Sequence, residues 1–400
     1  MTLQFIREHA GDDLNRLLLN ASRYPEVDMP FVVEQIAIRR QVREKLPLWC
    51  ANEGVIFPSR LAAEQSSSEQ AARYKQRLAA GLVHVCDLTG GMGVDSFFLS
   101  RVVERLTYIE RNGAYCDAAR QNFAALNAPN ITVWEGDAAA LLPDLPETGL
   151  FYIDPARRGK GDKRLFALQD CEPDLQRLAP VLLERAPAVV AKLSPMADIS
   201  HTLSLLPATV EVHVLAVRNE VKELLFVMKR GGEGRAPVIR CVHFTTAGKE
   251  EAFSFLAEEE KAAPSRPAPR LMAYLYEPNA SILKAGAFKR IAFCYGVEKL
   301  HVNSHLYTSD RLVEDFPGRI FEVEEAFPFS GKRCKTLAQY IPQANITTRN
   351  FPLTAEALRQ RTKIRDGGEA YLFATTTAKE GKVLIKCRKP AALTNRPSGS

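Results

Sequence analysis

Apolar residues in the first eighty positions recur at the spacing of amphipathic helices. Three leucines that stand three and four residues apart form the first such series: Leu14, Leu17 and Leu18. A second helix is predicted over residues 30–47, which begin and end at a proline. A third has clearer ends, because Ser66 to Glu69 is a capping-box pattern and Gly81 can close the helix in a left-handed conformation. The pattern predicts a helical N-terminal region over residues 1–80.

From residue 82 the pattern changes to short apolar runs separated by helix-length segments. The runs are 82–88, 106–110, 131–134, 150–154 and 188–193, and the helical stretches between most of them are 94–104, 113–127 and 170–184. Such alternation predicts right-handed crossovers and a parallel sheet covered on both faces. The next runs, 210–217 and 223–228, are only about five residues apart, which is too short for a crossover helix, so they are predicted to form an antiparallel hairpin. We assign this α/β domain to residues 81–245.

The rest of the chain reads as a linker followed by two small α+β segments. Residues 246–270 include a charged stretch rich in proline and alanine and are predicted to be a loop or linker. Residues 271–330 form a connecting region in which Asn279 caps a helix that Gly296 ends. The elements predicted from 319 onward are a strand (319–327), a helix (332–341), a strand (344–351), a helix (354–362) and a hairpin (369–376 with 382–388). Residues 331–400 are the final module.

Charge is distributed unevenly. The net charge of the chain is +6, yet residues 331–400 alone carry 14 Lys and Arg against 4 Asp and Glu. A localised positive surface favours a polyanion such as RNA or DNA, although it is equally typical of a surface that charge keeps soluble. The basic residues of the module that are candidates for phosphate contacts are Lys332, Arg333, Lys335, Arg349, Arg359, Arg361, Lys363 and Arg365.

Hydropathy and cysteine usage indicate a cytoplasmic protein. No run approaches about 18 uninterrupted apolar residues, so no membrane span is expected. The first eight residues carry charges where a signal peptide needs apolar ones. The eight cysteines lie far apart and never form CxxC, which argues against a zinc site and for reduced, mostly buried thiols. No metal is expected, and the sequence does not indicate an oligomeric state.

A glycine-rich turn follows the first apolar run. Its residues are Asp87, Leu88, Thr89, Gly90, Gly91, Met92 and Gly93. Glycines there let the backbone approach a ligand, and the N-terminus of the following helix favours a negative group. Acidic residues also end four successive runs: Asp87, Glu110, Asp137 and Asp154. In an open sheet these ends share the carboxyl edge, where ligands bind; Glu110 could accept from both ribose hydroxyls, and Asp137 could reach an adenine amino group.

These features resemble the class I S-adenosylmethionine-dependent methyltransferases, whose Rossmann-like seven-stranded sheet ends in such a hairpin. A nicotinamide fingerprint fits less well, because after Gly91 and Gly93 its third glycine position is Ser96. The resemblance implies that the turn, with Asp87, Thr89, Gly90, Gly91 and Gly93, holds the methionine end of the cofactor. It also implies Glu110 for the ribose and Asp137 for adenine.

A closer resemblance extends through the whole chain, to bacterial methyltransferases with a C-terminal THUMP-like domain. It rests on Glu64–Glu69 leading to Tyr74-Lys75, on Asp87–Gly91, on Lys192-Leu-Ser-Pro195, on Asn219–Leu225 and on Ile341–Asn345. Those enzymes are related to the RNA-cap guanine-N2 (trimethylguanosine synthase-like) methyltransferases, and THUMP domains bind RNA. The resemblance therefore implies an RNA methyltransferase and gives the basic module a partner.

The fourth run leads into Asp154-Pro155-Ala156-Arg157-Arg158-Gly159, where the methyl group would be transferred. Nucleic-acid amine methyltransferases usually carry Asp/Asn-Pro-Pro-aromatic here, so the acid and the first proline match while the second proline and the aromatic residue do not. We expect Asp154 and Pro155 to be catalytic, with Asp154 as hydrogen-bond acceptor or base. Arg157 could stack on a base and either arginine could bind phosphate, or both could lie on a solvated loop.

The residues after the fifth run bear on the accepting atom. RNA uracil-5 methyltransferases need a cysteine nucleophile there, and this chain has Lys192-Leu193-Ser194-Pro195. Serine is a far poorer nucleophile than a thiolate, which favours transfer to a nitrogen. Lys192 either contacts a substrate phosphate or simply reaches solvent. Two alternatives remain open: a methyltransferase that acts on a small molecule or protein, and a non-catalytic RNA-binding protein with a degenerate site.

Overall fold

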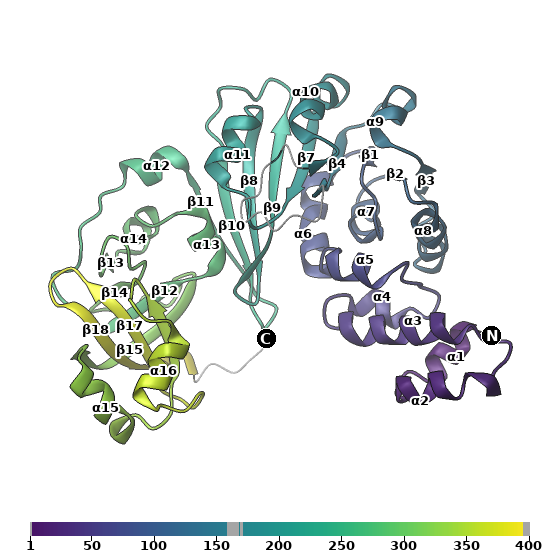
Figure 1. Ribbon diagram of the computed structural model, residues 1–400. Coiled ribbons are helices and arrows are strands. Elements are labelled where there is room, and N and C mark those ends of the chain that lie inside the picture. The colour runs from purple at the N-terminus through teal and green to yellow at the C-terminus, as the bar shows by residue number, and fades with distance from the viewer. Residues whose placement is uncertain (1, 158–167, 169–170, 395–400) are drawn as a thin grey trace. The chain divides into compact units, whose positions relative to one another are not determined.

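The computed structural model describes residues 2–157, 168 and 171–394 (Figure 1). The chain forms two compact units. The first comprises Met1–Val212 with Glu223–Arg235, and the second comprises His213–Lys222 with Ala236–Ser400.

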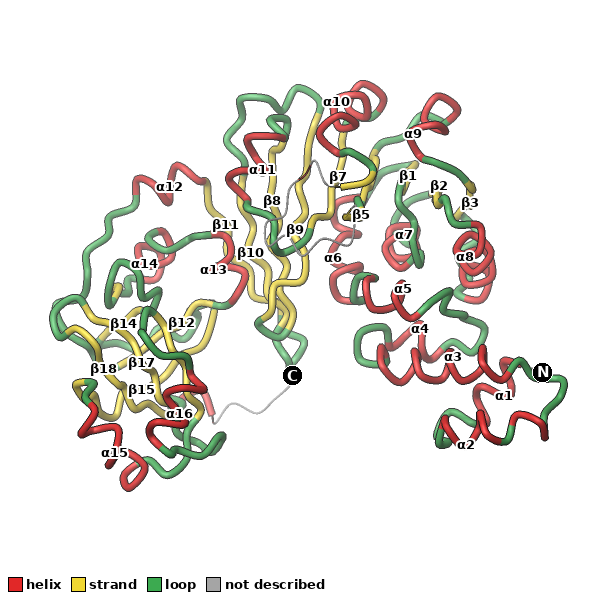
Figure 2. The backbone as a smooth tube through the Cα atoms, viewed as in Figure 1, coloured by secondary structure: helices red, strands yellow, loops and turns green. Residues whose placement is uncertain are grey.

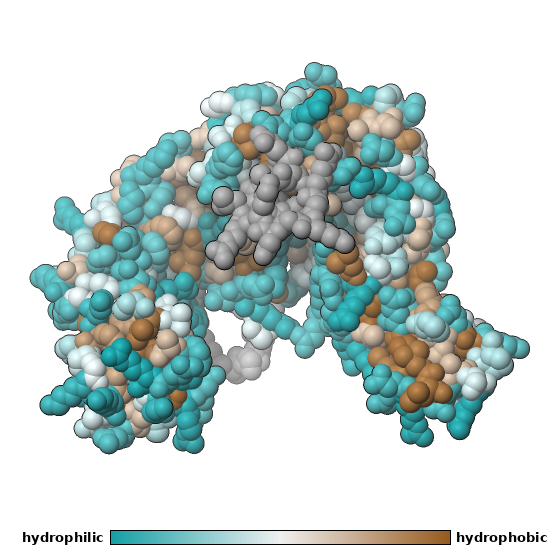
Figure 3. All heavy atoms as spheres, in the orientation of Figure 1, coloured by the Kyte–Doolittle hydropathy of each residue, from teal (hydrophilic) through white to brown (hydrophobic). Residues whose placement is uncertain are grey.

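The first unit begins with the predicted helical region, which holds six α-helices among its described residues where three were expected. They are α1 (Thr2–Glu8), α2 (Leu14–Leu19), α3 (Met29–Val42), α4 (Pro47–Ala51), α5 (Arg60–Gln65) and α6 (Glu69–Ala79), with a 3-10 turn at Ala21–Arg23. Their core is an apolar cluster that includes Phe5, Ile6, Leu17, Met29, Val32 and Ile36. Figure 3 shows apolar side chains gathered over these helices, whose exposed apolar residues include Leu18, Leu19 and Leu61.

The ends of α6 partly follow the prediction. Gly81 is left-handed, with φ +82°, as expected after the helix. The expected capping box from Ser66 to Glu69 does not form. Ser68 is the N-cap instead, and its hydroxyl accepts from the Ala71 amide. Glu69 accepts instead from the amides of Leu48 and Trp49 at the start of α4, at 2.6 and 3.2 Å. Its carboxylate therefore satisfies the N-terminus of a different helix, which fastens α4 to α6.

The sheet that follows the N-terminal helices has the predicted parallel strands and the predicted hairpin. Its strands are β1 (His84–Asp87), β2 (Arg105–Glu110), β3 (Ile131–Glu135), β4 (Leu150–Ile153), β7 (Ala188–Leu193), β8 (Thr209–Val217) and β9 (Glu220–Lys229). They run in the order β8-β9-β7-β4-β1-β2-β3. The pairs β1–β2, β2–β3, β1–β4 and β4–β7 are parallel, whereas β9 runs antiparallel to β7. This is the Rossmann-like methyltransferase sheet.

Helices flank these strands, as Figure 2 shows. They are α7 (Val94–Ser100), α8 (Gly113–Ala125), α9 (Ala138–Leu141) with a 3-10 turn at Leu142–Asp144, α10 (Leu175–Arg185) and α11 (Ile199–Leu205). The helix predicted from residue 170 starts at Leu175, capped by Asp174. Before it, β6 (Cys171–Glu172) pairs antiparallel with β5 (Ala156–Arg157) just after β4.

The segment expected to be a linker, 246–270, is only partly a loop. β10 (Val238–Phe244) pairs antiparallel with β11 (Glu250–Leu256), and α12 (Ala257–Ala262) follows directly. Phe253 and Phe255 are buried and alternate with the exposed Ala252 and Ser254, which is the pattern of a half-covered strand. The sequence analysis missed this strand because residues 258–270, which follow it, are charged and rich in proline.

The second unit continues with short helices and a second sheet. The single helix expected after Asn279 is two, α13 (Ala280–Ala285) and α14 (Arg290–Tyr295), because Gly286 is left-handed and ends the first. Asn279 caps α13 and Gly296 ends α14, as predicted. The strands β12 (Tyr274–Pro278), β13 (Glu298–Lys299), β14 (Tyr307–Ser309), β15 (Gly318–Pro328), β16 (Asn345–Arg349), β17 (Tyr371–Thr377) and β18 (Gly381–Arg388) run in the order β13-β14-β12-β15-β18-β17-β16.

The elements predicted from residue 319 onward are present within two residues of their expected ends. α15 (Gly331–Tyr340) and α16 (Ala355–Thr362) share an apolar cluster with the sheet, and α17 (Ala391–Thr394) follows it. A second cluster, which includes Phe321, Phe373 and Ile385, contains other side chains of the same strands. The two clusters cover opposite faces because neighbouring residues of a strand point to opposite sides. Among the described residues no helix is long and apolar enough to cross a membrane.

Candidate functional site

The glycine turn connects β1 to α7, and at each of its three glycine positions the structure requires or favours glycine. A side chain at Gly90 would place its Cβ 2.1 Å from the ring of Tyr108, so only glycine fits there. Gly91 and Gly93 have φ of +54° and +85°, which favours glycine. Tyr108 donates from its hydroxyl to the Gly91 carbonyl and so holds the turn against β2.

Asp87 organises this turn from inside. Its carboxyl group is fully buried and accepts from the Thr89 amide at 3.0 Å and from the Ser96 hydroxyl. The pKa of Asp87 is raised to about 7, mainly by burial; the two hydrogen bonds oppose the rise, and the nearby carboxylates of Asp95 and Asp154 add to it. Near neutral pH this carboxyl group is therefore close to its midpoint of ionisation.

Glu110 and Asp137 lie on the wall of the same pocket, where the sequence placed them. Glu110 accepts from the Gly91 amide at 3.0 Å and from the Asn112 amide at 2.9 Å. Asp137 is the N-cap of α9, and its Oδ1 accepts from the amides of Ala139 and Ala140. Backbone donors thus hold both oxygens of Glu110 and one oxygen of Asp137, and each carboxylate keeps further lone pairs for a ligand.

The pocket has a volume of about 280 Å³ and is formed by residues of the first unit. All seven cofactor-binding candidates from the sequence line it: Asp87, Thr89, Gly90, Gly91, Gly93, Glu110 and Asp137. Residues Gln65, Ser66 and Ser67, between α5 and α6, line it as well. The helical N-terminal region therefore contributes one wall of the pocket.

Asp154 stands at the end of β4 and also lines the pocket. Its amide donates to Thr89 Oγ1 at 2.6 Å, which links the end of β4 to the glycine turn, and Pro155 behind it is buried. Its carboxylate lies 2.5 Å from Lys192 Nζ and remains 38% exposed. Asp154 can therefore accept a further hydrogen bond from a group in the pocket.

Lys192 is buried and so does not reach solvent, but it lines the pocket. Its ammonium group lies near Asp154 Oδ2, near Ser67 Oγ at 3.3 Å and near Asp95 Oδ2 at 3.6 Å. Burial alone would lower the pKa of Lys192, but the surrounding carboxylates, Asp154 first among them, raise it above its usual value. It is therefore a fixed cation beside Asp154.

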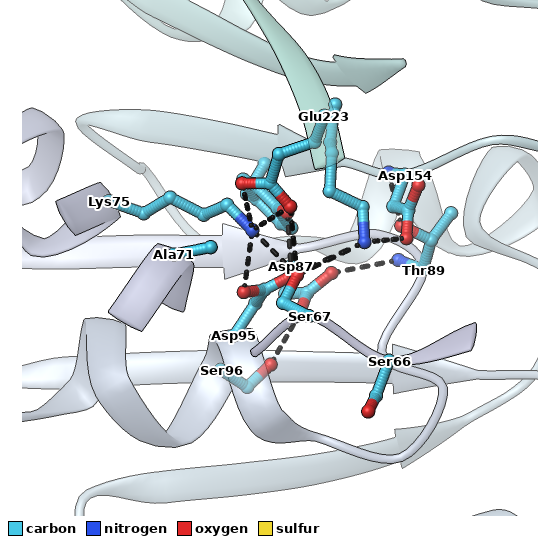
Figure 4. Close-up of polar contacts among 12 residues, drawn as sticks. Ser66, Ser67, Ala71, Lys75, Asp87, Thr89, Asp95, Ser96, Asp154 and Glu223 are labelled. Atoms are coloured by element: carbon cyan, nitrogen blue, oxygen red, sulfur yellow. Dashed lines mark hydrogen bonds and ion pairs between the residues drawn. The ribbon is translucent and has the colours of Figure 1, made fainter. Parts of the chain in front are cut away.

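Lys192 belongs to a buried charge cluster, which we define as Ser67, Lys75, Asp95, Lys192 and Glu223. Figure 4 labels the other members of this cluster. Lys75 is 1% exposed and donates to Ser67 Oγ at 2.7 Å, Asp95 Oδ1 at 2.8 Å and Glu223 Oε2 at 3.0 Å. Ser67 donates to Asp95 Oδ2 at 2.8 Å, which also accepts from the Tyr152 hydroxyl at 2.8 Å. The cluster joins α6, α7, β7 and β9.

Sequence reasoning assigned no role to Ser67, Lys75, Asp95 or Glu223. A signal was nevertheless present, because the segments that carry the resemblance to methyltransferases include Ser67, Lys75, Lys192 and Glu223. These segments are distant in the chain and meet only in the folded protein.

The remaining candidates are Arg157 and Arg158. The backbone of Arg157 belongs to β5 and pairs with Cys171. Arg158 lies outside the described residues. Within the described part of the chain, no group of three or more His, Cys, Asp or Glu residues is arranged to hold a metal ion.

Comparisons with known proteins agree with this geometry. One family model, a ferredoxin-like domain, matches residues 274–317, and another, THUMP domain-like, matches residues 318–389.

Two crystal structures, each of a "putative methyltransferase", are similar. The one from Porphyromonas gingivalis W83 is 40% identical, with 97% of each chain covered and a TM-score of 0.89. The other, from Streptococcus mutans in complex with SAH, is 13% identical, covering 40% of this chain and 96% of its own, with a TM-score of 0.31. No curated protein matches the chain at a significant level.

The buried charge cluster yields a stability prediction. Lys75→Met leaves Asp95 and Glu223 buried with one cation fewer, so the free energy of unfolding is expected to fall by about 3–5 kcal/mol. Tryptophan fluorescence during denaturation reports on the first unit, because Trp49 and Trp134 both lie in it. Arg120→Gln is the matched control: it breaks an exposed ion pair with Asp117 and should cost less than about 1 kcal/mol. Equal small losses in both variants would contradict a structural role for Lys75.

Asp87 yields a pH prediction. Below pH 7 its carboxyl group is mostly neutral and attracts a positively charged ligand less, whereas above pH 7 it is ionised. The affinity for S-adenosylmethionine, measured by calorimetry, is therefore expected to fall by about tenfold between about pH 8 and about pH 6. The amino group of the ligand titrates equally with every variant, so Asp87→Asn should show a shallower slope. Equal slopes in the two proteins would rule out this role.

Proposed function

Because the chain belongs to a family of class I S-adenosylmethionine-dependent methyltransferases with a THUMP-like C-terminal domain, we propose that it methylates a base nitrogen of RNA in the cytoplasm. The proposal rests on the carboxylate of Asp154, which is partly exposed on the wall of the pocket beside the glycine turn.

The pocket fits S-adenosylmethionine, the cofactor of this family. The absence of side chains at Gly90 and Gly91 leaves backbone close to the pocket, and Asp87 provides a carboxyl group at the turn. Glu110 would hold the ribose hydroxyls and Asp137 the adenine amino group, since each keeps accepting capacity beyond its backbone donors. The cofactor supplies an electrophilic methyl group whose transfer leaves a neutral thioether.

Asp154 is proposed to orient the accepting amine. Its carboxylate accepts a hydrogen bond from an N–H of the amine, which directs the nitrogen lone pair at the methyl group. Methylation would leave a positive charge on the nitrogen, and Asp154 or water would take up the proton that the nitrogen then releases. Lys192 holds the carboxylate in one orientation and is therefore a positioning residue.

Transfer to nitrogen is favoured over transfer to carbon 5 of a pyrimidine. Carbon-5 chemistry needs a cysteine nucleophile, and none of the described residues that line the pocket is a cysteine. An amine needs no covalent activation, so the carboxylate of Asp154 suffices.

RNA is supported as substrate by the second unit. THUMP domains are of an RNA-binding type, and the region matched as THUMP domain-like contains most of the chain's positive surplus. All eight cysteines are free thiols, which supports a reducing compartment.

The proposal is tested by incubating the protein with methyl-labelled S-adenosylmethionine and RNA from cells that lack the gene, then identifying the labelled nucleoside by mass spectrometry. An N-methylated nucleoside is the expected product. Asp154→Ala should lower kcat by about a hundredfold or more while the Kd for the cofactor stays within about twofold. Label in protein or small molecules alone would favour the alternative substrates, and no transfer with intact cofactor binding would favour a non-catalytic protein.

A second prediction isolates the positioning role of Lys192. Lys192→Met should lower kcat because Asp154 loses the group that orients it, whereas KM for RNA should remain unchanged. Lys192→Arg keeps the positive charge and should recover part of kcat. If KM rises instead and kcat is kept, Lys192 contacts the substrate and is not a positioning residue.

A further inference from the structure

A buried carboxylate in the second unit holds two arginines. Glu277 on β12 has a side chain that is 2% exposed, and Arg319 lies directly opposite it on β15. Arg319 donates to Glu277 Oε2 through Nε at 2.6 Å and also through Nη2. Arg349, at the end of β16, donates to Oε1 through Nε at 3.1 Å, with its Nη2 at 3.0 Å. One anion is thus shared by two cations.

A third cation adjoins this group. The ammonium group of Lys389 lies 4.4 Å from the ring centre of Phe321 and 5.4 Å from that of Tyr371. The guanidinium of Arg319 lies over the same Phe321 ring, at 5.5 Å. Burial and the charge of Arg319 lower the pKa of Lys389, while Glu277 raises it. We call Glu277, Arg319, Arg349 and Lys389 the Glu277 cluster, in which three basic groups face one acidic group.

The cluster keeps hydrogen-bond donors available. Both arginines engage Glu277 through Nε and Nη2, and within the described part of the chain the Nη1 of neither forms a hydrogen bond. Their side chains are each 38% exposed. Thr375, next to Arg349 in the β16–β17 register, is buried and its hydroxyl has no hydrogen-bond partner among the described residues. A phosphate could use the free guanidinium edges.

Other basic residues of the module differ from this cluster. Arg388 lies near both Glu322 and Glu324, and Arg359 near both Glu356 and Asp366, so their charges are matched by acids at the surface. Of the eight candidates from the sequence, Arg349 is therefore the one that a buried carboxylate fixes in place. Arg319 and Lys389 were not among those eight.

We propose that the Glu277 cluster binds a phosphate group of the RNA backbone, an inference that rests on the proposed RNA substrate. Arginine forks match phosphate oxygens in geometry, and the buried Glu277 fixes both forks without neutralising them. Glu277 belongs to the ferredoxin-like region and both arginines to the THUMP-like region, so the phosphate site is built jointly by the two.

The test measures binding of a fluorescent single-stranded RNA of mixed sequence to the full-length protein over a range of salt concentrations. Arg349→Gln should weaken binding several-fold and reduce the slope of log K against log salt by about 0.7, because one phosphate contact is lost. Arg388→Gln removes the same charge from the same module and is the matched control. It should leave the slope unchanged.

Two further variants separate binding from folding. Lys389→Gln removes a cation that has no ion pair or hydrogen bond within the described residues, so it should reduce the slope and cost only the stability of the cation–π contacts with Phe321 and Tyr371. Arg349→Lys keeps the charge and should keep the slope while it weakens binding through loss of the fork.

The outcomes distinguish the inference from the function on which it rests. If the wild-type protein binds no RNA at low salt, the proposed RNA substrate fails. If the wild-type protein binds RNA but folded Arg349→Gln and Lys389→Gln both keep its slope, the cluster only joins two regions of the fold. In that case the phosphate site is overturned and the RNA substrate stands.

Discussion

Two buried ammonium groups constrain the first unit more than any other interaction. Lys75 and Lys192 lie in the interior, where an unpaired charge costs several kcal/mol. Each must therefore meet carboxylates, and those carboxylates come from distant parts of the chain: Asp95 from α7, Glu223 from β9 and Asp154 from the end of β4. Satisfying the charges brings the N-terminal helices, the glycine turn and the terminal hairpin to one place. The pocket is the space left in front of them.

The same constraint gives two neighbouring carboxyl groups different properties. Asp87 is surrounded by the turn and by Ser96, none of the described cations forms an ion pair with it, and its pKa is raised to about 7, mainly by burial. Asp154 has the ammonium group of Lys192 at 2.5 Å and keeps one side open to the pocket. The first is suited to respond to a positive ligand, and the second to hold a fixed acceptor in front of an amine.

The parts of this site that the sequence predicted depend on local patterns. The glycine turn, the acids at the ends of β1 to β4 and the elements after residue 319 follow from periodicity, capping residues and the two-sided burial of parallel strands. The parts that it missed depend on contacts between distant residues. Nothing near Lys75 in the chain indicates that Asp95 and Glu223 surround it, and nothing near Lys192 indicates that it turns inward. The capping role expected of Glu69 failed for the same reason, because the amides of Leu48 and Trp49 compete for its carboxylate.

The two units use buried charge in opposite senses. Around the pocket of the first unit, Asp95, Glu223 and Asp154 outnumber Lys75 and Lys192, and Glu110 and Asp137 add further negative charge on the wall. Such a surplus suits a cofactor whose sulfonium and amino groups are positive, and disfavours a phosphate. In the Glu277 cluster the basic groups outnumber the single acid, which suits a phosphate and disfavours the cofactor. In the first unit, the buried lysines hold the more numerous carboxylates in place. In the second unit, the buried Glu277 holds the more numerous basic side chains. The sign of the surplus therefore matches a positively charged ligand at the pocket and a phosphate group at the Glu277 cluster.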